Sequence, residues 1–319
     1  MKFPRTLLEF GEVFPDEAAC WQALRKARWP FGFRCPRCDH QRSSQLVKRR
    51  LEQCCRCRYQ ASVTAGTVLH RTQVPLRVWF LGVFFLARHK RGVSALQFQK
   101  DAGLGSYQTA WSLLHKLRVA MGQEDLRALF GLVEVDETYV GATREQGLRG
   151  GREVGNKTIV VGAVEHRDDR AGALRLQVLE GITFDHDLGP FVHQTIDPKR
   201  ATVRTDGLTS YRPLPAAGFH HDRQIEGHRR NAKEILPWIH LVFTNLKAWI
   251  RGAFHGVSKK HMQRYLDEFV FRFDRRVNEY GLLRALLNRV ALQLNQRPRK
   301  TLAFHCPAEV LNDNVALTG

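Results

Sequence analysis

Two aspartates stand where strands are expected to end in a strongly basic chain. Asp136 lies in the alternating run LVEVDETYVG, and Asp206 lies near the end of the run ATVRTDG. Carboxylates at the ends of neighbouring strands can share divalent cations. A pair of cations about 4 Å apart activates the attacking oxygen and stabilises the leaving oxygen of an in-line displacement at phosphate. The pattern therefore predicts metal-dependent phosphodiester chemistry.

The charge of the chain indicates the class of substrate. Its 319 residues include 50 Lys plus Arg against 31 Asp plus Glu, a formal net charge of +19. A surplus of this size attracts polyanions, and it recurs in nearly every segment, which favours nucleic acid over a simple solubility role. Binding to nucleic acid should weaken steeply with salt, because each neutralised phosphate releases counterions.

Cysteine spacing predicts a structural metal site. Four of the seven cysteines form two CxxC pairs, in CPRC and CCRC. These four are Cys35, Cys38, Cys54 and Cys57. In a chain without secretory features, two such pairs are typical of a tetrahedral zinc site rather than of disulfides. Cys55 is an alternative ligand to Cys54, while Cys20 and Cys306 are expected to be inert thiols.

Periodicity divides the N-terminal part into three regions. Residues 1–30 are expected to form a helical segment, because EAACWQALRKARW has helical apolar spacing. Residues 31–68 should form a zinc ribbon, with QLVKRRLEQ as one strand between the cysteine pairs. Residues 75–122 form a helical module in which the most apolar run, LRVWFLGVFFLA, is too short to span a membrane.

The helical module has the outline of a helix-turn-helix. Ser94 is expected to cap one helix, a glycine turn follows, and Ser106 caps the next. The second helix would present Tyr107, Gln108 and Lys116 to a DNA groove. The alternative is a helical hairpin that only packs against a neighbouring domain.

Residues 130–280 predict a mixed α/β sheet. Three runs of period two are followed by a helix and then by the run that contains Asp206. The loop 143–157 is glycine-rich and cationic, which suits either a phosphate contact or an ordinary solvated loop. Residues 281–319 are expected to form a C-terminal helical tail.

The segment EILPWIHLVFTNLKAWIRGAFHG predicts a long helix with two distinct stripes. Pro237 suits the first turn, and five apolar residues recur at helical spacing. These are Ile239, Val242, Phe243, Leu246 and Ile250. The opposite stripe carries His240, Lys247 and Arg251, and the first two are seven residues apart, so two turns bring them to nearly the same angle. If this helix packs on the sheet, both face the two aspartates.

Four motifs together resemble a known family, the ISXO-like transposases of bacterial insertion sequences. They are CPRC with CCRCRYQASVTAGT, EVDETYVG, RTDGLTSY and HLVFTNLKAWIRGAFHGVSKKHMQRYLDEFVFRFDRR, in order from about residue 15 to 280. The resemblance implies a zinc ribbon followed by a DDE-type catalytic domain of RNase H-like fold. It makes Asp136 and Asp206 metal ligands, places His240 where such enzymes commonly have glutamate, and makes Lys247 the characteristic lysine.

The resemblance also implies the activity, the cofactors and the partners. The expected enzyme cleaves and transfers DNA strands by a two-metal mechanism with magnesium or manganese, and its ribbon holds structural zinc. Histidine in the third position removes one negative charge and favours manganese, or marks a degenerate site. The expected partners are double-stranded transposon ends and target DNA, bound through residues that include Lys247 and Arg251, with homo-oligomerisation on DNA.

The location and two competing functions complete the expectations. The N-terminal residues show no signal peptide, so a cytoplasmic, nucleoid-associated protein without membrane contact is expected. One alternative is a catalytically inactive DNA-binding regulator that uses the zinc ribbon and the helix-turn-helix. Another is an RNase H-like nuclease or resolvase.

Overall fold

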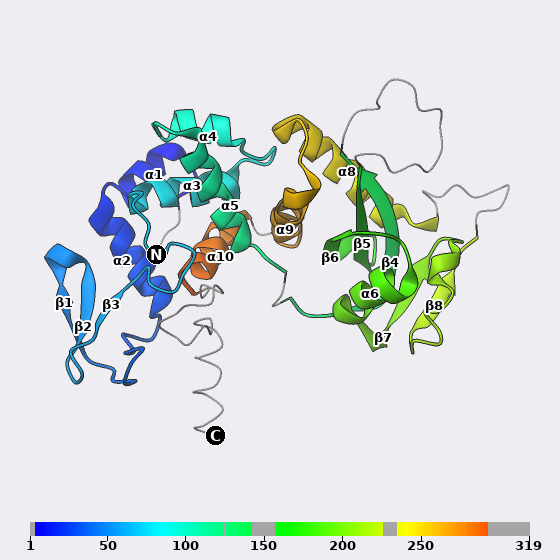
Figure 1. Cartoon of the computed structure of the whole chain (residues 1–319), viewed down its shortest axis with the longest axis horizontal. Helices are drawn as coiled ribbons and strands as arrows, with labels where there is room; N and C mark the ends of the chain where they lie inside the picture. The colour runs from blue at the N-terminus through cyan, green and yellow to red at the C-terminus, as the bar shows by residue number, and fades with distance from the viewer. Residues whose placement is uncertain (1–3, 124–125, 142–156, 226–234, 278, 293–319) are drawn as a thin grey trace. The chain divides into compact units, whose positions relative to one another are not determined.

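The computed structural model describes residues 4–123, 126–141, 157–225, 235–277 and 279–292. Figure 1 shows the order of the elements along the chain. The chain forms two compact units. Unit 1 comprises residues 1–121 together with 278–319, and unit 2 comprises residues 122–277. The second unit is therefore inserted into the first.

Helices form the larger part of unit 1. Their bounds are α1 Leu7–Val13, α2 Glu17–Arg28, α3 Leu76–Arg88 and α10 Glu279–Leu292. The N-terminal segment is thus two helices, capped by the side chains of Thr6 and Asp16, rather than one. Helix α10 returns from the end of unit 2 and packs against α2 and α3. Within the described ranges, no helix is both long and apolar enough to cross a membrane.

The cysteine-rich region is a small three-stranded antiparallel sheet. Its strands are β1 Ser43–Leu46, β2 Leu51–Cys54 and β3 Gln60–Ser62, in the order β1-β2-β3. The expectation of one strand between the cysteine pairs is wrong. Residues Val47–Arg49 form a 3₁₀ turn and Arg50 adopts a left-handed conformation (φ 52°), so the segment folds back as a hairpin.

Two further helices of unit 1 show the predicted helix-turn-helix outline. They are α4 Ala95–Asp101 and α5 Tyr107–Val119. Both predicted caps are confirmed, because the hydroxyls of Ser94 and Ser106 accept hydrogen bonds from the N–H groups of Gln97 and Thr109. The buried side of α5 carries Ala110, Leu113, Leu114 and Leu117.

Unit 2 is built on a five-stranded mixed sheet, which confirms the expected α/β fold. Its strands are β4 Leu129–Val140, β5 Thr158–Arg167, β6 Arg170–Leu179, β7 Ile196–Thr205 and β8 His220–Arg223. The order is β6-β5-β4-β7-β8. The first three strands in sequence pair antiparallel, whereas β7 runs parallel to both β4 and β8.

Helices cover both faces of this sheet. Helix α6 Gly189–Thr195 packs in the core on one face, and α8 Pro237–Phe254 and α9 Lys259–Phe273 pack on the other. Side chains alternate along β4, so Val133 and Val135 belong to the first core and Val140 to the second. The face that carries the even-numbered residues of β4 is therefore the face that α8 covers.

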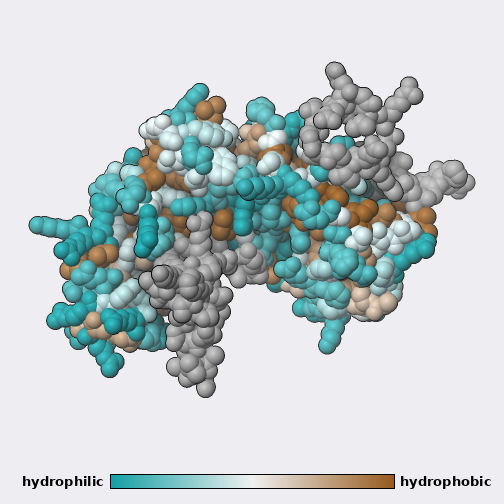
Figure 2. Space-filling model, in the orientation of Figure 1, coloured by the Kyte–Doolittle hydropathy of each residue, from teal (hydrophilic) through white to brown (hydrophobic). Residues whose placement is uncertain are grey.

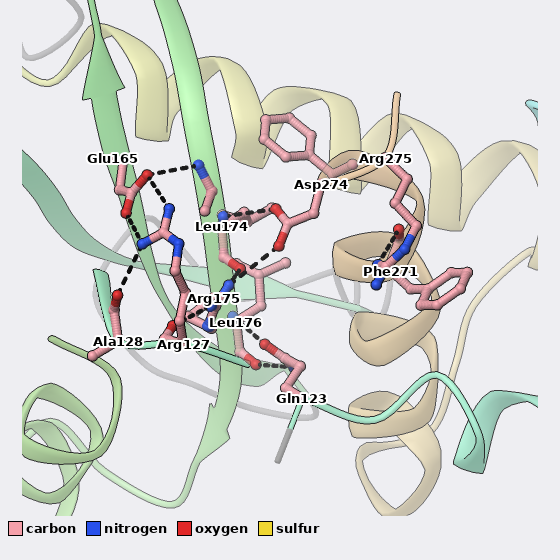
Figure 3. Close-up of polar contacts among 12 residues, drawn as sticks. Gln123, Arg127, Ala128, Glu165, Leu174, Arg175, Leu176, Phe271, Asp274 and Arg275 are labelled. Atoms are coloured by element: carbon pink, nitrogen blue, oxygen red, sulfur yellow. Dashed lines mark hydrogen bonds and ion pairs between the residues drawn. The ribbon is translucent and has the colours of Figure 1, made fainter. Parts of the chain in front are cut away.

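Strand β6 pairs with β5 on one side, and side chains bond to the backbone along its other, outer edge (Figure 3). Gln123 bonds both the N–H and the carbonyl of Leu176, and Asp274 accepts from the N–H of Leu174. Asp274 also forms an ion pair with the buried Arg175 at 3.2 Å. These contacts satisfy backbone groups that would otherwise invite pairing with another chain.

Candidate active site and cysteine cluster

Strand register places the two predicted aspartates opposite each other. Glu134 on β4 pairs with Arg204 on the parallel strand β7. Two residues further along each strand come Asp136 and Asp206, the latter just past the end of β7. Neighbouring strands lie about 4.8 Å apart, so the register favours a shared carboxylate site. The Asp206 carboxylate accepts a hydrogen bond from the N–H of Leu208 at 2.9 Å, which fixes its orientation.

The environment of Asp136 disfavours its charge. The residue is 8% exposed, and burial, together with the carboxylates of Glu137 and Asp206, raises the pKa of its carboxyl group to about 8. The backbone N–H of Glu137 and the charge of Lys247 act in the opposite direction. A buried carboxyl group next to other acids is the arrangement that a divalent cation would neutralise.

Helix α8 brings His240 to this carboxylate. The Nδ1 atom of His240 lies 3.9 Å from Oδ2 of Asp136. The helix begins at Pro237 and buries all five predicted apolar residues, and His240, one residue after the buried Ile239, lies at the edge of that face rather than opposite it. The side chains of His, Cys, Asp and Glu offer the possible metal-ligand atoms. In the described part of the chain, only one group of at least three such residues has all its ligand atoms within 4.8 Å of one another, and it is formed by Cys35, Cys38, Cys54 and Cys57. The structure therefore pairs His240 with Asp136 but does not gather both aspartates and the histidine that closely.

Lys247 and Arg251 follow His240 along the same helix. Both line a pocket of about 310 Å³ together with Tyr139 and Gly141 at the end of β4. Partial burial lowers the pKa of Lys247, Lys157 lowers it further, and the charge of Asp136 acts in the opposite direction. Two cationic side chains therefore flank the predicted carboxylate site.

Glu137, the neighbour of Asp136, does not take the position of His240. It lies on the opposite face of β4 from Asp136, and its Oε2 accepts a hydrogen bond from the hydroxyl of the buried Tyr211 at 2.9 Å. Glu226, Glu234 and most of the glycine-rich loop 143–157 lie outside the described residues.

The four predicted zinc ligands form one cluster. The Sγ atoms of Cys35 and Cys57 lie 3.6 Å apart, as do those of Cys38 and Cys54. Zinc–sulfur bonds of about 2.3 Å in a tetrahedron require sulfurs about 3.8 Å apart, so the cluster fits that ion. Cys55 is exposed and lies outside the cluster.

Cys20 does not join this cluster. Cys20 is fully buried in α2, and burial raises the pKa of its thiol to about 12, which makes it unreactive. Cys306 lies outside the described residues.

Both regions match families of known proteins. Residues 128–274 match the ISXO2-like transposase domain, and residues 15–60 match the transposase zinc-ribbon domain. The chain therefore contains an ISXO2-like transposase domain and a transposase zinc-ribbon domain. It is also 30% identical over 142 residues to an uncharacterized protein in transposable element ISH50 of Halobacterium salinarum. The match covers 44% of this chain and 46% of that protein, so the chain spans about half the length of that relative.

The ISXO2-like domain contains every residue of the carboxylate site. Asp136, Asp206, His240, Lys247 and Arg251 all fall within residues 128–274. The matched zinc-ribbon segment contains all four clustered cysteines. The donor sets agree with this division, because thiolates suit zinc and carboxylates with one imidazole suit a harder divalent cation.

One residue beside Asp136 was not expected from the sequence. Glu134 is fully buried on β4, and its Oε2 accepts hydrogen bonds from the N–H groups of Trp238 and Ile239, both at 2.9 Å. The available signal was the period of two along β4, which places Glu134 on the same face as Asp136. Nothing in the local sequence of α8 indicated that its first turn would bond to residue 134.

The raised pKa of Asp136 predicts a stability penalty in the protein without catalytic cations. Because the folded pKa lies above the unfolded value, the protonated carboxyl group stabilises the fold at low pH. This contribution is lost as pH rises from about 4 through about 8. Asp136→Asn removes the buried charge, so its unfolding free energy should exceed that of wild type by on the order of 1–3 kcal/mol at pH 8.

Denaturant unfolding of both proteins at several pH values, with the ribbon loaded with zinc and no other divalent cation added, measures this difference. Asp187→Asn is a control in which the effect on stability should have the opposite sign, because the pKa of Asp187 is lowered rather than raised. Hydrogen bonds from Thr183 and Gly181 outweigh slight burial and lower the pKa of Asp187, so that variant should lose stability toward neutral pH. If the difference in unfolding free energy between wild type and Asp136→Asn stayed constant from pH 4 to 8, the raised pKa of Asp136 would be contradicted.

Proposed function

We propose that the chain is the transposase of an insertion sequence, which binds the terminal inverted repeats and catalyses metal-dependent strand cleavage and strand transfer. The observation that carries this proposal is the convergence of parts distant in sequence. Asp136 on β4 and Asp206, just past the end of the parallel strand β7, each lie two residues beyond the paired Glu134 and Arg204, and His240 of α8 lies 3.9 Å from Asp136. The family match supports it.

Each side chain has a proposed role in the site. Asp136 and Asp206 would hold magnesium or manganese ions, and His240 would offer a nitrogen ligand beside Asp136. When bound, these cations would offset charge on the scissile phosphate and assist the attacking and leaving oxygens. Lys247, held near Asp136, is placed to contact the phosphate, and Arg251 is placed to contact the flanking backbone in the same pocket.

The proposed DNA contacts include a face of α5. Gln108 and Lys116 line a groove of about 240 Å³ with Arg71 and Thr72. Tyr107, at the start of the helix, is 49% exposed. Hydrophilic residues cover much of the surface in view in Figure 2, consistent with the charge of +19. We propose that this face and the ribbon bind the ends, and that subunits assemble on paired ends of DNA in the nucleoid.

Strand cleavage tests the proposal. The full-length, zinc-loaded protein is incubated with a DNA fragment that carries the element's own ends, with magnesium or with manganese. We expect nicks at the element boundaries, followed by joining of the freed ends to target DNA. Binding without cleavage in either metal would indicate a regulator instead. Cleavage of branched or RNA–DNA hybrid substrates without strand transfer would indicate a nuclease or resolvase.

A further inference from the structure

The first turn of α8 is bonded to the sheet and not to a local cap. Leu236, the residue before the helix, provides no side-chain hydrogen bond, and Pro237 has no N–H to donate. The next two N–H groups, of Trp238 and Ile239, both donate to Oε2 of Glu134 at 2.9 Å. A charged acceptor at a helix N-terminus is favoured both by these bonds and by the helix dipole.

This contact lies directly beside the predicted site. Glu134 and Asp136 are two residues apart on β4 and share one face of the strand. On the helix, Ile239 is followed immediately by His240, whose Nδ1 lies 3.9 Å from Asp136. One strand and one helical turn therefore meet at two adjacent points, first at Glu134 and then at Asp136.

The contact comes at an energetic cost that a simple helix cap would avoid. Glu134 is fully buried, and its Oε1 has no hydrogen-bond partner among the described residues. Burial raises the pKa of Glu134, which shows that its charge is disfavoured there, although the two N–H groups and Arg204 oppose the shift. A short polar side chain just before a helix is its usual cap, but Leu236 is apolar and buried, so Glu134 supplies the acceptor from the sheet instead.

We propose that Glu134 is a positioning residue, which fixes the start of α8 so that His240 stays within reach of Asp136. The proposal rests on the proposed function, because it assigns Glu134 a role in the same site. Glu134 contacts neither DNA nor cations itself. It acts through His240, because it holds the two residues that precede this histidine. A misplacement of a reacting group by about 1 Å can lower a rate about 100-fold, so loss of this anchor should have a large effect.

Strand cleavage by three variants of the full-length protein tests this role. Glu134→Ala removes both hydrogen bonds, whereas Glu134→Gln keeps an oxygen that can accept them. The matched control is Glu165→Ala, which removes a buried glutamate of the same sheet that bonds to Arg127 and to the N–H of Phe130. Per folded molecule, we expect Glu134→Ala to cleave about 10- to 100-fold more slowly than wild type. Glu134→Gln and Glu165→Ala should stay within about threefold.

A double-mutant cycle separates positioning from a general structural effect. If Glu134 acts through His240, then adding Glu134→Ala to His240→Ala should slow cleavage by less than about threefold. Additive losses would overturn the proposal. If Glu134→Ala does not fold, Glu134→Asp is tested in its place. Its side chain is one methylene group shorter, so either the start of α8 shifts toward β4 or the hydrogen bonds to Trp238 and Ile239 are lost. Equal rates for the Asp variant and wild type would also overturn the proposal.

Hydrogen exchange provides a readout that does not depend on catalysis. In wild type without catalytic cations, the amides of Trp238 and Ile239 should be protected, and this protection should fall at least about tenfold in Glu134→Ala but not in Glu165→Ala. Unchanged protection would overturn the positioning role. If wild type shows this protection but cuts no DNA, the proposed function fails while the anchor at Glu134 stands.

Discussion

Asp136→Asn and Asp206→Asn should each slow strand cleavage by at least about 1,000-fold while leaving affinity for the transposon ends nearly unchanged. Each substitution removes a charged oxygen from a site where the register of β4 and β7 sets the two residues opposite each other. Such a ligand stabilises charge in the transition state, whereas binding of the ends depends on phosphate contacts distributed over the protein. Cleavage rate and gel-shift affinity measured on the same fragment separate the two effects.

Asp197→Asn is the matched control for this pair. Asp197 lies near the start of β7, at the opposite end of the strand from Asp206, and caps the N–H of Lys199. It should cut at the wild-type rate. A wild-type rate in either Asp136→Asn or Asp206→Asn would remove that residue from the site, and a parallel loss of end binding in both would point to a DNA-binding defect.

Cys38→Ser should release zinc and unfold the ribbon. The core of this region is small, formed by Phe33, Cys35, Cys54 and Ala61. Structural zinc contributes about 10–16 kcal/mol of apparent binding free energy in comparable small modules, so the ribbon depends on the ion for its fold. We expect the zinc content to fall from one ion per chain to none and end binding to weaken at least tenfold.

Cys55→Ser provides the control for the loss of zinc. Cys55 is a neighbour of Cys54 but is exposed and outside the cluster. Its zinc content, measured by mass spectrometry of the purified protein, should equal that of wild type. Zinc loss in Cys55→Ser with retention in Cys38→Ser would show that the wrong thiols had been assigned.

Local patterns were sufficient to predict several elements. The two serine caps at Ser94 and Ser106 act within three residues, and both form as expected. The apolar stripe of α8 from Ile239 to Ile250 is buried, because a single face of a helix determines which residues meet the sheet. The period of two in the run that contains Asp136 predicted a strand there, and β4 spans Leu129–Val140.

Other features depended on contacts that sequence spacing does not encode. The bond from Trp238 to Glu134 joins residues 104 apart, so no local cap signal announces it. The hairpin at Val47–Arg49 needs a left-handed Arg50, and arginine gives no sign of that conformation in a sequence. Helical spacing predicted that His240 faces the aspartates only on the condition that the helix packs on the sheet, and its role as a ligand came from the family resemblance.

The return of α10 to α2 and α3 gives the chain two covalent crossings between its units. Cleavage by a protease at one crossing would leave the inserted unit attached through the other. A truncation near residue 277 would have a different effect, because it would strip the N-terminal unit of Leu282, Leu286 and Val290, which are buried in the intact chain. The sheet-based unit is one continuous stretch of the sequence, whereas the other unit draws its residues from both ends of the chain.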